Sequence, residues 1–506
     1  MTAGAPSAEA GHAGSVEESS ALEPRSTGPE RPLFHLSPPR GWLSDPVGLV
    51  VVDGSYHAFF QHYPDGDDWG PMHWGHAVST DLVSWQHRGV ALAPDADGMI
   101  FSGSAVVDPG TGSRPAGTVV AAYTRHSPDR EVQCLALSTD GGASWVRDPA
   151  GPVLEPAEPT PDFRDPRLLR WHSSAGDHWV MLVAAGQGIE LYTSPDLETW
   201  QFASRFARPS HAAEAWETPD LMPLRAPDGS VSWVLTIGAM TAGPESPTQV
   251  RYFVGDFDGR EFSCPAGMAS RLADFGPDFY AAQCWSGASE PVWTGWLGNW
   301  AYARSTPADG WRGVLAIPRV LALVDGPGGL RLAQRPVPQL DDLPWTTGAT
   351  GAVAVAAHWI DLLPAAAAID LTLVLDPALV SAVELGIGGA VLCWTDGVLD
   401  LDLSGASAGV DDTWGLRRAR HRAEVGRGRC ELRLVVDRCV LEVFAAEGAV
   451  VMSAELYGAR PRIAVQARVP GAVRSGGASE STTDQDPAGV ITIRASRRMD
   501  AVPPAK

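Results

Sequence analysis

A short motif that recurs along the first half of the chain limits the fold more than any other feature. Each copy combines a Ser/Thr-Asp turn with a closing aromatic residue, and the copies lie at 79–85, 138–145, 194–200 and, in a looser form, 256–262. The closing residues recur about every 55 to 62 positions, the length of a four-stranded blade with long loops; they are Trp85, Trp145, Trp200 and Phe262. The repeat predicts a β-propeller in which each turn connects two strands of a blade and each aromatic ring packs between blades.

The rest of the chain also has the pattern of short strands. From residue 41 onward the apolar runs are short, β-branched or aromatic, and separated by Gly, Pro, Asp and Ser clusters, as is typical of antiparallel sheets. Alternating runs near the C-terminus indicate a second all-β unit, for which a sandwich is the simplest architecture; they lie at 369–375, 432–436, 440–444 and 450–456. A Gly-, Ser- and Asp-rich segment at 470–489 predicts a disordered loop before a last strand at 490–495.

Composition gives the boundaries and a location. The first 31 residues are rich in Ala, Gly, Ser, Pro and Glu, which is typical of a disordered tail. They lack the basic start and apolar run of a signal peptide, and no run of about 20 apolar residues exists for a membrane span. We therefore expect a cytoplasmic protein with a disordered tail over 1–31, a propeller over 32–335, a linker over 336–345, a sandwich over 346–500 and a short tail over 501–506.

Charge and residue content limit the partners. A net charge of -22 argues against binding a phosphate backbone or an anionic membrane surface, so no nucleic acid and no membrane is expected. Nineteen Trp residues provide rings that can stack on sugars, although most will lie in the core. The six Cys residues form no CxxC pair, so neither a zinc site nor a disulfide framework is indicated. A small neutral saccharide is the expected partner, and the oligomeric state stays open.

Three short motifs carry one acidic residue each at the point where it would serve chemistry. They are Trp-Leu-Ser-Asp-Pro-Val-Gly with Asp45, Arg-Asp-Pro with Asp165, and Trp-Glu-Thr-Pro-Asp with Glu217. Two carboxyl groups that converge on a glycosidic carbon are the machinery of glycoside hydrolysis, and a third can bind sugar hydroxyls. The first motif precedes the first repeated turn, and the other two each fall between two turns, so three blades can each deliver one carboxylate to a single site on the propeller axis.

In order, spacing and flanking residues the three motifs resemble glycoside hydrolase family 32, the retaining β-fructofuranosidases, which include invertases, levanases and inulinases. The resemblance covers most of 33–500, and the segment 436–448 looks like the C-terminal sandwich of that family. It implies a five-bladed β-propeller followed by a β-sandwich, with no metal and no cofactor. It also implies that Asp45 is the nucleophile, Glu217 the acid/base and Asp165 the transition-state stabiliser.

The resemblance further implies a set of substrate-binding residues, and the role of proton donor requires surroundings that keep Glu217 protonated. A proton on Glu217 near neutral pH requires an apolar neighbour and nearby negative charge, for which Trp216 and Asp220 are the candidates. The substrate-binding residues expected at the positions of the family motifs are Ser44, Gln61, Trp69, Trp74, Phe101, Ser102, Arg164, Tyr280 and Trp296. His62, His73 and His76 lack acidic partners, so they do not indicate a metal site.

Three positions depart from the family motifs. Ser44 and Val47 stand where relatives usually have Asn, and Thr218 stands where Cys is common. None of these changes removes a carboxylate, so we expect activity, with substrate preference the property they put in question.

The expected reaction is release of terminal β-D-fructofuranosyl residues from sucrose or short fructo-oligosaccharides by double displacement, with sucrose favoured in a cytoplasmic enzyme. A fructosyltransferase or a levan- or inulin-type fructan hydrolase on the same fold stays open. So do an inverting arabinan-type hydrolase, disfavoured by the motif order, and an inactive carbohydrate-binding propeller, disfavoured by the intact Asp45 and Glu217. The sequence does not choose among sucrose, sucrose 6-phosphate, levan and inulin.

Overall fold

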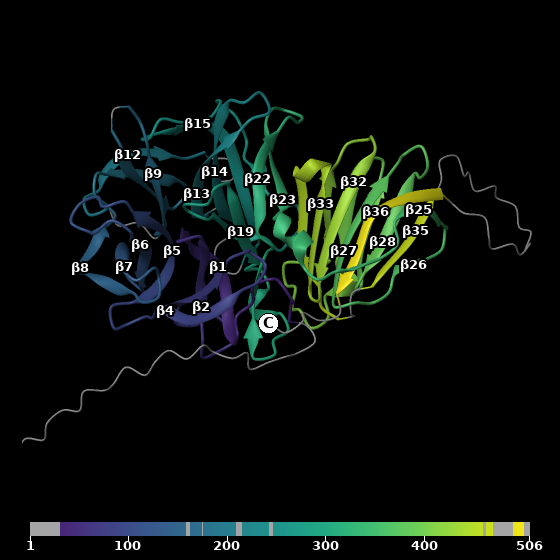
Figure 1. Ribbon diagram of the computed structural model, residues 1–506, viewed down its shortest axis with the longest axis horizontal. Coiled ribbons are helices and arrows are strands. Elements are labelled where there is room, and N and C mark those ends of the chain that lie inside the picture. The colour runs from purple at the N-terminus through teal and green to yellow at the C-terminus, as the bar shows by residue number, and fades with distance from the viewer. Residues whose placement is uncertain are drawn as a thin grey trace, which may run out of the picture.

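The protein is built from two all-β bodies that lie side by side (Figure 1). The structure, a computed structural model, describes residues 31–157, 162–174, 176–208, 215–241, 246–458, 462–468 and 489–499. The tail predicted at 1–31 lies outside these residues except for Arg31, which stacks on Trp311. The tail predicted at 501–506 and nearly all of the loop predicted at 470–489 also lie outside them. None of the helices within them is long and apolar enough to cross a membrane.

Five antiparallel sheets form the N-terminal body. Blade I contains β1 (Gly41–Val52), β2 (Ser55–Tyr63), β3 (His73–Ser79) and β4 (Gln86–Leu92). Blade II contains β5 (Met99–Asp108), β6 (Thr118–Ser127), β7 (Arg130–Ser138) and β8 (Val146–Leu154). Blade III contains β9 (Phe163–Trp171), β10 (His178–Ala185), β11 (Ile189–Ser194) and β12 (Gln201–Phe206).

Blade IV contains β13 (Ala215–Arg225), β14 (Val231–Met240), β15 (Thr248–Phe257) and β16 (Phe262–Ser263), with β17 (Arg271–Leu272) also on β15. Blade V contains β18 (Tyr280–Cys284), β19 (Val292–Leu297), β22 (Arg319–Val324) and β23 (Arg331–Pro336), with β21 (Val314–Leu315) also on β19. The innermost strands β1, β5, β9, β13 and β18 contact one another in that order, and β18 contacts β1. β20 (Trp311–Arg312) pairs in parallel with β1 and joins the end of the ring to its start. The predicted five-bladed propeller is confirmed.

The repeated turn has the role predicted from the sequence. Ser79 Oγ accepts the backbone N–H groups of Asp81 and Leu82, and the Asp81 carboxylate accepts the next two N–H groups. The same bonds recur between β11 and β12. Trp85, which follows the first turn, stacks on Trp285 of blade V with ring centroids 6.2 Å apart. These bonds are local in sequence, which explains why the motif is readable without the structure.

The C-terminal body is a two-sheet sandwich. One sheet has the order β24 (Thr346–Thr347), β36 (Gly489–Met499), β27 (Ala368–Leu375), β32 (Cys430–Asp437), β33 (Val440–Ala445) and β34 (Val450–Glu455), with β25 (Gly351–Val355) also on β36. The other has the order β26 (Ile360–Leu363), β35 (Ile463–Arg468), β28 (Ala382–Ile387), β29 (Ala390–Thr395), β30 (Val398–Asp402) and β31 (Arg420–Glu424). Leu371, Leu373 and Leu375 alternate inward with the period of a strand and are fully buried in the core of the sandwich. The strand predicted at 490–495 lies within β36, which extends further to Met499. The 3-10 helix Pro338–Asp342 lies between β23 and β24.

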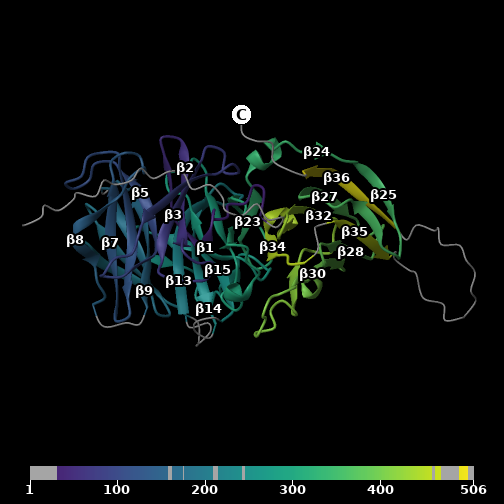
Figure 2. The same ribbon diagram turned by 90° about the horizontal axis from the view of Figure 1, so that it is seen from below.

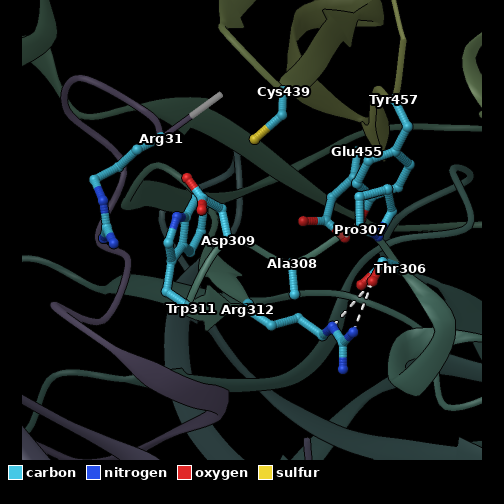
Figure 3. Close-up of a pocket in the computed structure, with 11 residues that line it drawn as sticks. Arg31, Thr306, Pro307, Ala308, Asp309, Trp311, Arg312, Cys439, Glu455 and Tyr457 are labelled. Carbon is cyan, nitrogen blue, oxygen red and sulfur yellow. Dashed lines mark hydrogen bonds between the residues drawn. The ribbon is translucent and has the colours of Figure 1, made fainter. Parts of the chain in front are cut away.

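Buried ion pairs connect the two bodies along the interface seen in Figure 2. His35, from the segment that precedes β1, donates through one ring nitrogen to Asp437 and through the other to Glu442, both at 2.9 Å. Arg319 of β22 also pairs with Glu442, and all three of these sandwich contacts are shielded from solvent. A separate cavity of about 210 Å³ lies at the same interface, lined in part by Trp311 (Figure 3). None of the three acidic motifs lines this cavity.

The ion pairs of His35 predict that the free energy of unfolding decreases at alkaline pH. Burial alone lowers the pKa of a histidine, but the bonds and charges of Asp437 and Glu442 outweigh it and raise the pKa to about 9. Because the folded-state pKa is raised, the contribution is complete below about pH 6.5 and is lost as the pH rises toward 9. We expect a contribution on the order of 3 kcal/mol at low pH. Thermal melts between pH 6 and 9.5 should show a loss of stability that His35→Gln flattens.

His172→Gln is the matched control, because His172 is a surface histidine that pairs with Asp177. A wild-type protein whose melting temperature follows that of His35→Gln across this pH range would contradict the prediction.

Candidate active site

A β-bulge occurs at the same place in every innermost strand, and it builds the site. In each case two residues of the inner strand oppose one residue of the neighbouring strand; the pairs are 44–45, 101–102, 165–166, 218–219 and 281–282. A bulge redirects side chains and ends regular pairing, which is why bulges are common next to active sites. In three blades the first bulge residue has a left-handed backbone, with φ of 63° at Asp165, 43° at Thr218 and 51° at Ala281. Such strain persists only where surrounding contacts hold it.

Bulge residues of blades I, II and III line a cavity of about 550 Å³, and Glu217, which precedes the bulge of blade IV, also lines it. Asp45 reaches it from blade I, Asp165 from blade III and Glu217 from blade IV. The structure therefore brings the three predicted carboxyl groups together. Other predicted substrate-binding residues on its wall are Ser44, Gln61, Trp69, Phe101, Ser102 and Arg164.

Asp45, the predicted nucleophile, has one engaged oxygen and one unengaged oxygen. Its Oδ2 accepts a hydrogen bond from Ser102 Oγ at 2.8 Å. Its Oδ1 is buried and has no hydrogen-bond partner among the described residues. Burial, with a further contribution from the charge of Glu217, raises the pKa of Asp45 to about 7, and the bond from Ser102 acts in the opposite direction.

Removal of the Ser102 hydroxyl should therefore move the acidic limb of the pH profile. A hydrogen bond to a charged group stabilises the ionised form, so Ser102→Ala is expected to shift the acidic limb of kcat/KM to higher pH by about one unit. The measurement is the pH dependence of kcat/KM for a fructoside. Ser102→Thr keeps the hydroxyl and should restore the limb; an acidic limb that stays in place in Ser102→Ala would exclude this role.

Asp165 is held between two blades. Its Oδ2 accepts the backbone N–H of Thr218 at 2.8 Å, and its own N–H donates to Thr124 Oγ1 at 2.9 Å. Burial raises the pKa of Asp165 well above its ordinary value; the charge of Arg164 opposes this shift, and that of Glu217 adds to it. The carboxylate is thus fixed in position by backbone contacts, as a residue that orients sugar hydroxyls would require.

Glu217, the predicted proton donor, lies between a cation and a phenol. Its Oε1 accepts from Arg164 Nη2 at 3.1 Å and from Nε at 3.3 Å, and its Oε2 accepts from the Tyr280 hydroxyl at 2.6 Å. Burial and the charge of Glu217 raise the pKa of Tyr280 well above its ordinary value, so this hydroxyl stays protonated and donates. Tyr280 does not itself line the cavity wall.

The two residues that the sequence proposed as neighbours of Glu217 have their main contacts elsewhere. Trp216 packs in the core against Phe206 and Phe253, with centroids 6.2 and 6.0 Å away. Asp220 pairs with Thr236 on β14, two residues from the partner of Glu217, so it lies one layer deeper in the channel. There Arg167 Nε donates to it at 2.6 Å and neutralises it.

Besides Tyr280, two other predicted substrate-binding residues do not line the cavity. Trp74 is fully buried and donates through Nε1 to the backbone carbonyl of Phe101 at 3.0 Å. Trp296 is buried against Trp42 and against Trp300, whose ring does line the cavity. Both support the pocket without lining it, because their strands turn those side chains into the propeller core.

The three residues that depart from the family motifs differ in their position relative to the cavity. Ser44 lines the cavity, and the N–H of Thr218 holds Asp165. Val47 is fully buried in the core with Phe59 and Trp74. The expectation that Val47 bears on substrate preference is therefore not supported, since this side chain does not line the site.

Several wall residues were not predicted. They are His126, Glu131, Asp162, Ala215, Met240, Trp300 and Arg304. Asp162 lies two residues before the Arg-Asp-Pro motif, so its place in the sequence could have indicated it. No such signal marks Glu131 and His126, because they reach the cavity from β7 and β6, the two middle strands of blade II, and lie far from the motifs in sequence.

Among the described residues no group of three or more His, Cys, Asp or Glu side chains is arranged to hold a metal ion. The wall of the site carries several carboxyl groups, and Arg164 contacts two of them, Glu217 and Glu131.

Comparisons with known proteins agree with the geometry. Residues 35–336 match the model of the glycosyl hydrolases family 32 N-terminal domain, and 399–482 match that of the family 32 C-terminal domain. A levanase from Bacillus subtilis is 41% identical over 63% of this chain, and the match spans 48% of the levanase, about half of its length. An extracellular exo-inulinase from Aspergillus ficuum is 32% identical over 89% of this chain and 93% of its own. The crystal structure of exo-inulinase from Aspergillus awamori superimposes with a TM-score of 0.79 at 26% identity, covering 94% of this chain and 99% of that one.

Proposed function

The chain belongs to glycosyl hydrolase family 32, and from this membership and the pocket we propose that it hydrolyses terminal β-D-fructofuranosyl residues with retention of configuration. The observation that carries the proposal is the convergence of Asp45, Asp165 and Glu217 from three blades on one cavity. Two of these carboxyl groups supply the nucleophile and the acid/base of a double displacement, and the third binds the sugar.

The reaction follows from the contacts of each group. Asp45 attacks the anomeric carbon of the fructosyl unit while Glu217 gives its proton to the departing glycosidic oxygen. The resulting fructosyl ester on Asp45 is hydrolysed by a water that returns its proton to Glu217. Asp165 binds sugar hydroxyls through charge-assisted hydrogen bonds as the oxocarbenium-like transition state forms.

The reactive protonation state has Asp45 ionised and Glu217 protonated. Burial of Asp45 and Asp165 together with Glu217 raises the pKa values of both aspartates, so the three groups do not all carry a charge near neutral pH. When the proton lies on Glu217, its charge no longer opposes ionisation of Asp45. One shared proton is therefore sufficient for the reactive form, and it needs neither a metal nor a cofactor.

The proposed substrates are sucrose and the terminal residues of short fructo-oligosaccharides, levan and inulin. The levanase and the exo-inulinase named above support the fructan part of this range. The test is a panel of sucrose, a levan-type and an inulin-type substrate with the purified protein. We expect release of fructose whose first-formed anomer is β by proton NMR.

Absence of fructose from every member of the panel, or an initial α-anomer, would overturn the proposal. Chromatography of products at high sucrose distinguishes hydrolysis from fructosyl transfer, because only transfer yields longer oligosaccharides.

A further inference from the structure

We propose that Glu131 is a positioning residue for the proton donor: it neutralises Arg164 and so allows Glu217 to hold the proton that the reaction consumes. The inference rests on the proposed function and adds to it a residue from blade II. That blade contributes Phe101 and Ser102 at its bulge, and no carboxylate, so Glu131 on β7 supplies its negative charge to the site.

Glu131 is a fixed negative charge. Its side chain is 6% exposed, and both of its oxygens accept from Arg164 Nη1, at 2.9 and 3.1 Å. Its Oε2 accepts the backbone N–H of Phe163 at 2.8 Å, and its Oε1 lies 3.0 Å from His126 Nδ1. Burial opposes ionisation, but the bond from His126, the charge of Arg164 and the N–H of Phe163 together lower the pKa of Glu131.

Arg164 is shared among three carboxylates. Its Nη2 lies 2.6 Å from Asp162 and 3.1 Å from Glu217, while its Nη1 contacts Glu131. A guanidinium in contact with a carboxylate favours the ionised form of that carboxylate. An ionised Glu217 cannot protonate a leaving group, so an Arg164 neutralised by Glu131 and Asp162 is the arrangement that proton donation requires.

The other groups around Glu217 include one further cation on the cavity wall, Arg304, which is paired with Asp68. Asp45 from β1 and Asp165 from β9 share the cavity and carry negative charge when ionised, and the Tyr280 hydroxyl from β18 is neutral. Arg164 is the cation in direct contact with Glu217. Loss of the charge on Glu131 should thus be felt mainly through Arg164.

The geometry also holds Glu131 rigidly against the wall of the pocket. His126, which contacts Glu131, stacks on Phe101 with ring centroids 4.1 Å apart and an interplanar angle of 6°. Phe101 and His126 both line the cavity. Glu131 can therefore keep Arg164 in place when substrate enters.

The test is Glu131→Gln, which keeps the size of the side chain and removes its charge. We expect the alkaline limb of the kcat/KM profile on sucrose or a fructan to move to lower pH by about one unit, so that at pH 8 activity falls about tenfold more than at pH 5. Glu190→Gln removes an equal charge from a surface ion pair with Arg205 and should leave the profile unchanged.

A second readout needs no substrate. Carbon-13 NMR of protein labelled at glutamate carboxyl carbons, with Glu217→Gln to assign the resonance, should show the titration midpoint of Glu217 at lower pH in Glu131→Gln. Inactivity of the wild type on every fructoside would refute the proposed function, whereas an unchanged midpoint would refute the role of Glu131.

The inference would be overturned if folded Glu131→Gln had the same kcat/KM profile as the wild type. An equal loss of kcat/KM at every pH would also overturn it, because that is the result expected of a purely structural role. If Glu131→Gln does not fold, Asp162→Asn takes its place, because the partly exposed Asp162 also contacts Arg164. An alkaline limb that stays in place in Asp162→Asn would equally overturn it.

Discussion

Asp45→Asn is expected to lower turnover of sucrose or a fructan by about a thousandfold or more, as the loss of a catalytic group commonly does. The amide cannot form the fructosyl ester, yet it has the shape of the carboxylate and can still accept the bond from Ser102. Because the change also removes a buried group whose pKa is raised to about 7, it relieves a desolvation cost and should leave thermal stability equal or higher. Loss of activity together with retained stability separates a catalytic role from a structural one.

The measurements are steady-state kinetics and a thermal melt. Asp53→Asn is the control, because Asp53 lies in the exposed turn between β1 and β2 at the far end of the same strand. A folded Asp45→Asn protein with wild-type turnover would remove Asp45 from the mechanism.

Glu217→Gln is expected to have the next largest effect, and the effect should depend on the leaving group. Sucrose and fructans lose a poor leaving group that needs a proton, so loss of the acid should cost roughly 10²- to 10⁴-fold. An aryl fructoside has an acidic phenol as its leaving group, and this phenol departs without a proton from the enzyme. Formation of the fructosyl ester from that substrate should therefore be affected far less. The glutamine amide can still accept from Tyr280 and Arg164, so the pocket should keep its shape.

The ratio of the two losses is the decisive quantity. It is measured as kcat/KM on both substrates, which reports the first chemical step. Equal losses on sucrose and the aryl fructoside would show that Glu217 is not the proton donor.

The fold could be predicted from the sequence because its repeating signals are local. Ser79 and Asp81 bond to backbone groups at most three residues away, so the turn is specified wherever those residues recur. Trp85 follows the turn directly, and its contact with Trp285 needs only that blades pack side by side. The blade number came from the resemblance, since the fifth blade lacks a clear copy of the motif.

The three carboxyl groups could also be predicted, but the reasons given for their properties could not. Asp220 is close to Glu217 in sequence, yet the strand register places it one layer deeper beside Arg167. Glu131, which is 33 residues from Arg164 in the chain, contacts that side chain directly. Electrostatic neighbours in a propeller come from different blades, so distance along the chain carries little information about them.

The sequence by itself determined the two-part all-β architecture, the order of the catalytic motifs and the identity of Asp45, Asp165 and Glu217, because these depend on local turns and on residue chemistry. Only the tertiary structure decided which aromatic and polar side chains reach the cavity. The bulge of an inner strand changes the direction of the side chains at that point, and this is where Asp45, Ser102 and Asp165 reach the cavity. Trp74, Trp296 and Val47 are instead buried in the core. The bulge is a property of pairing between two strands, and a single strand read alone does not contain it.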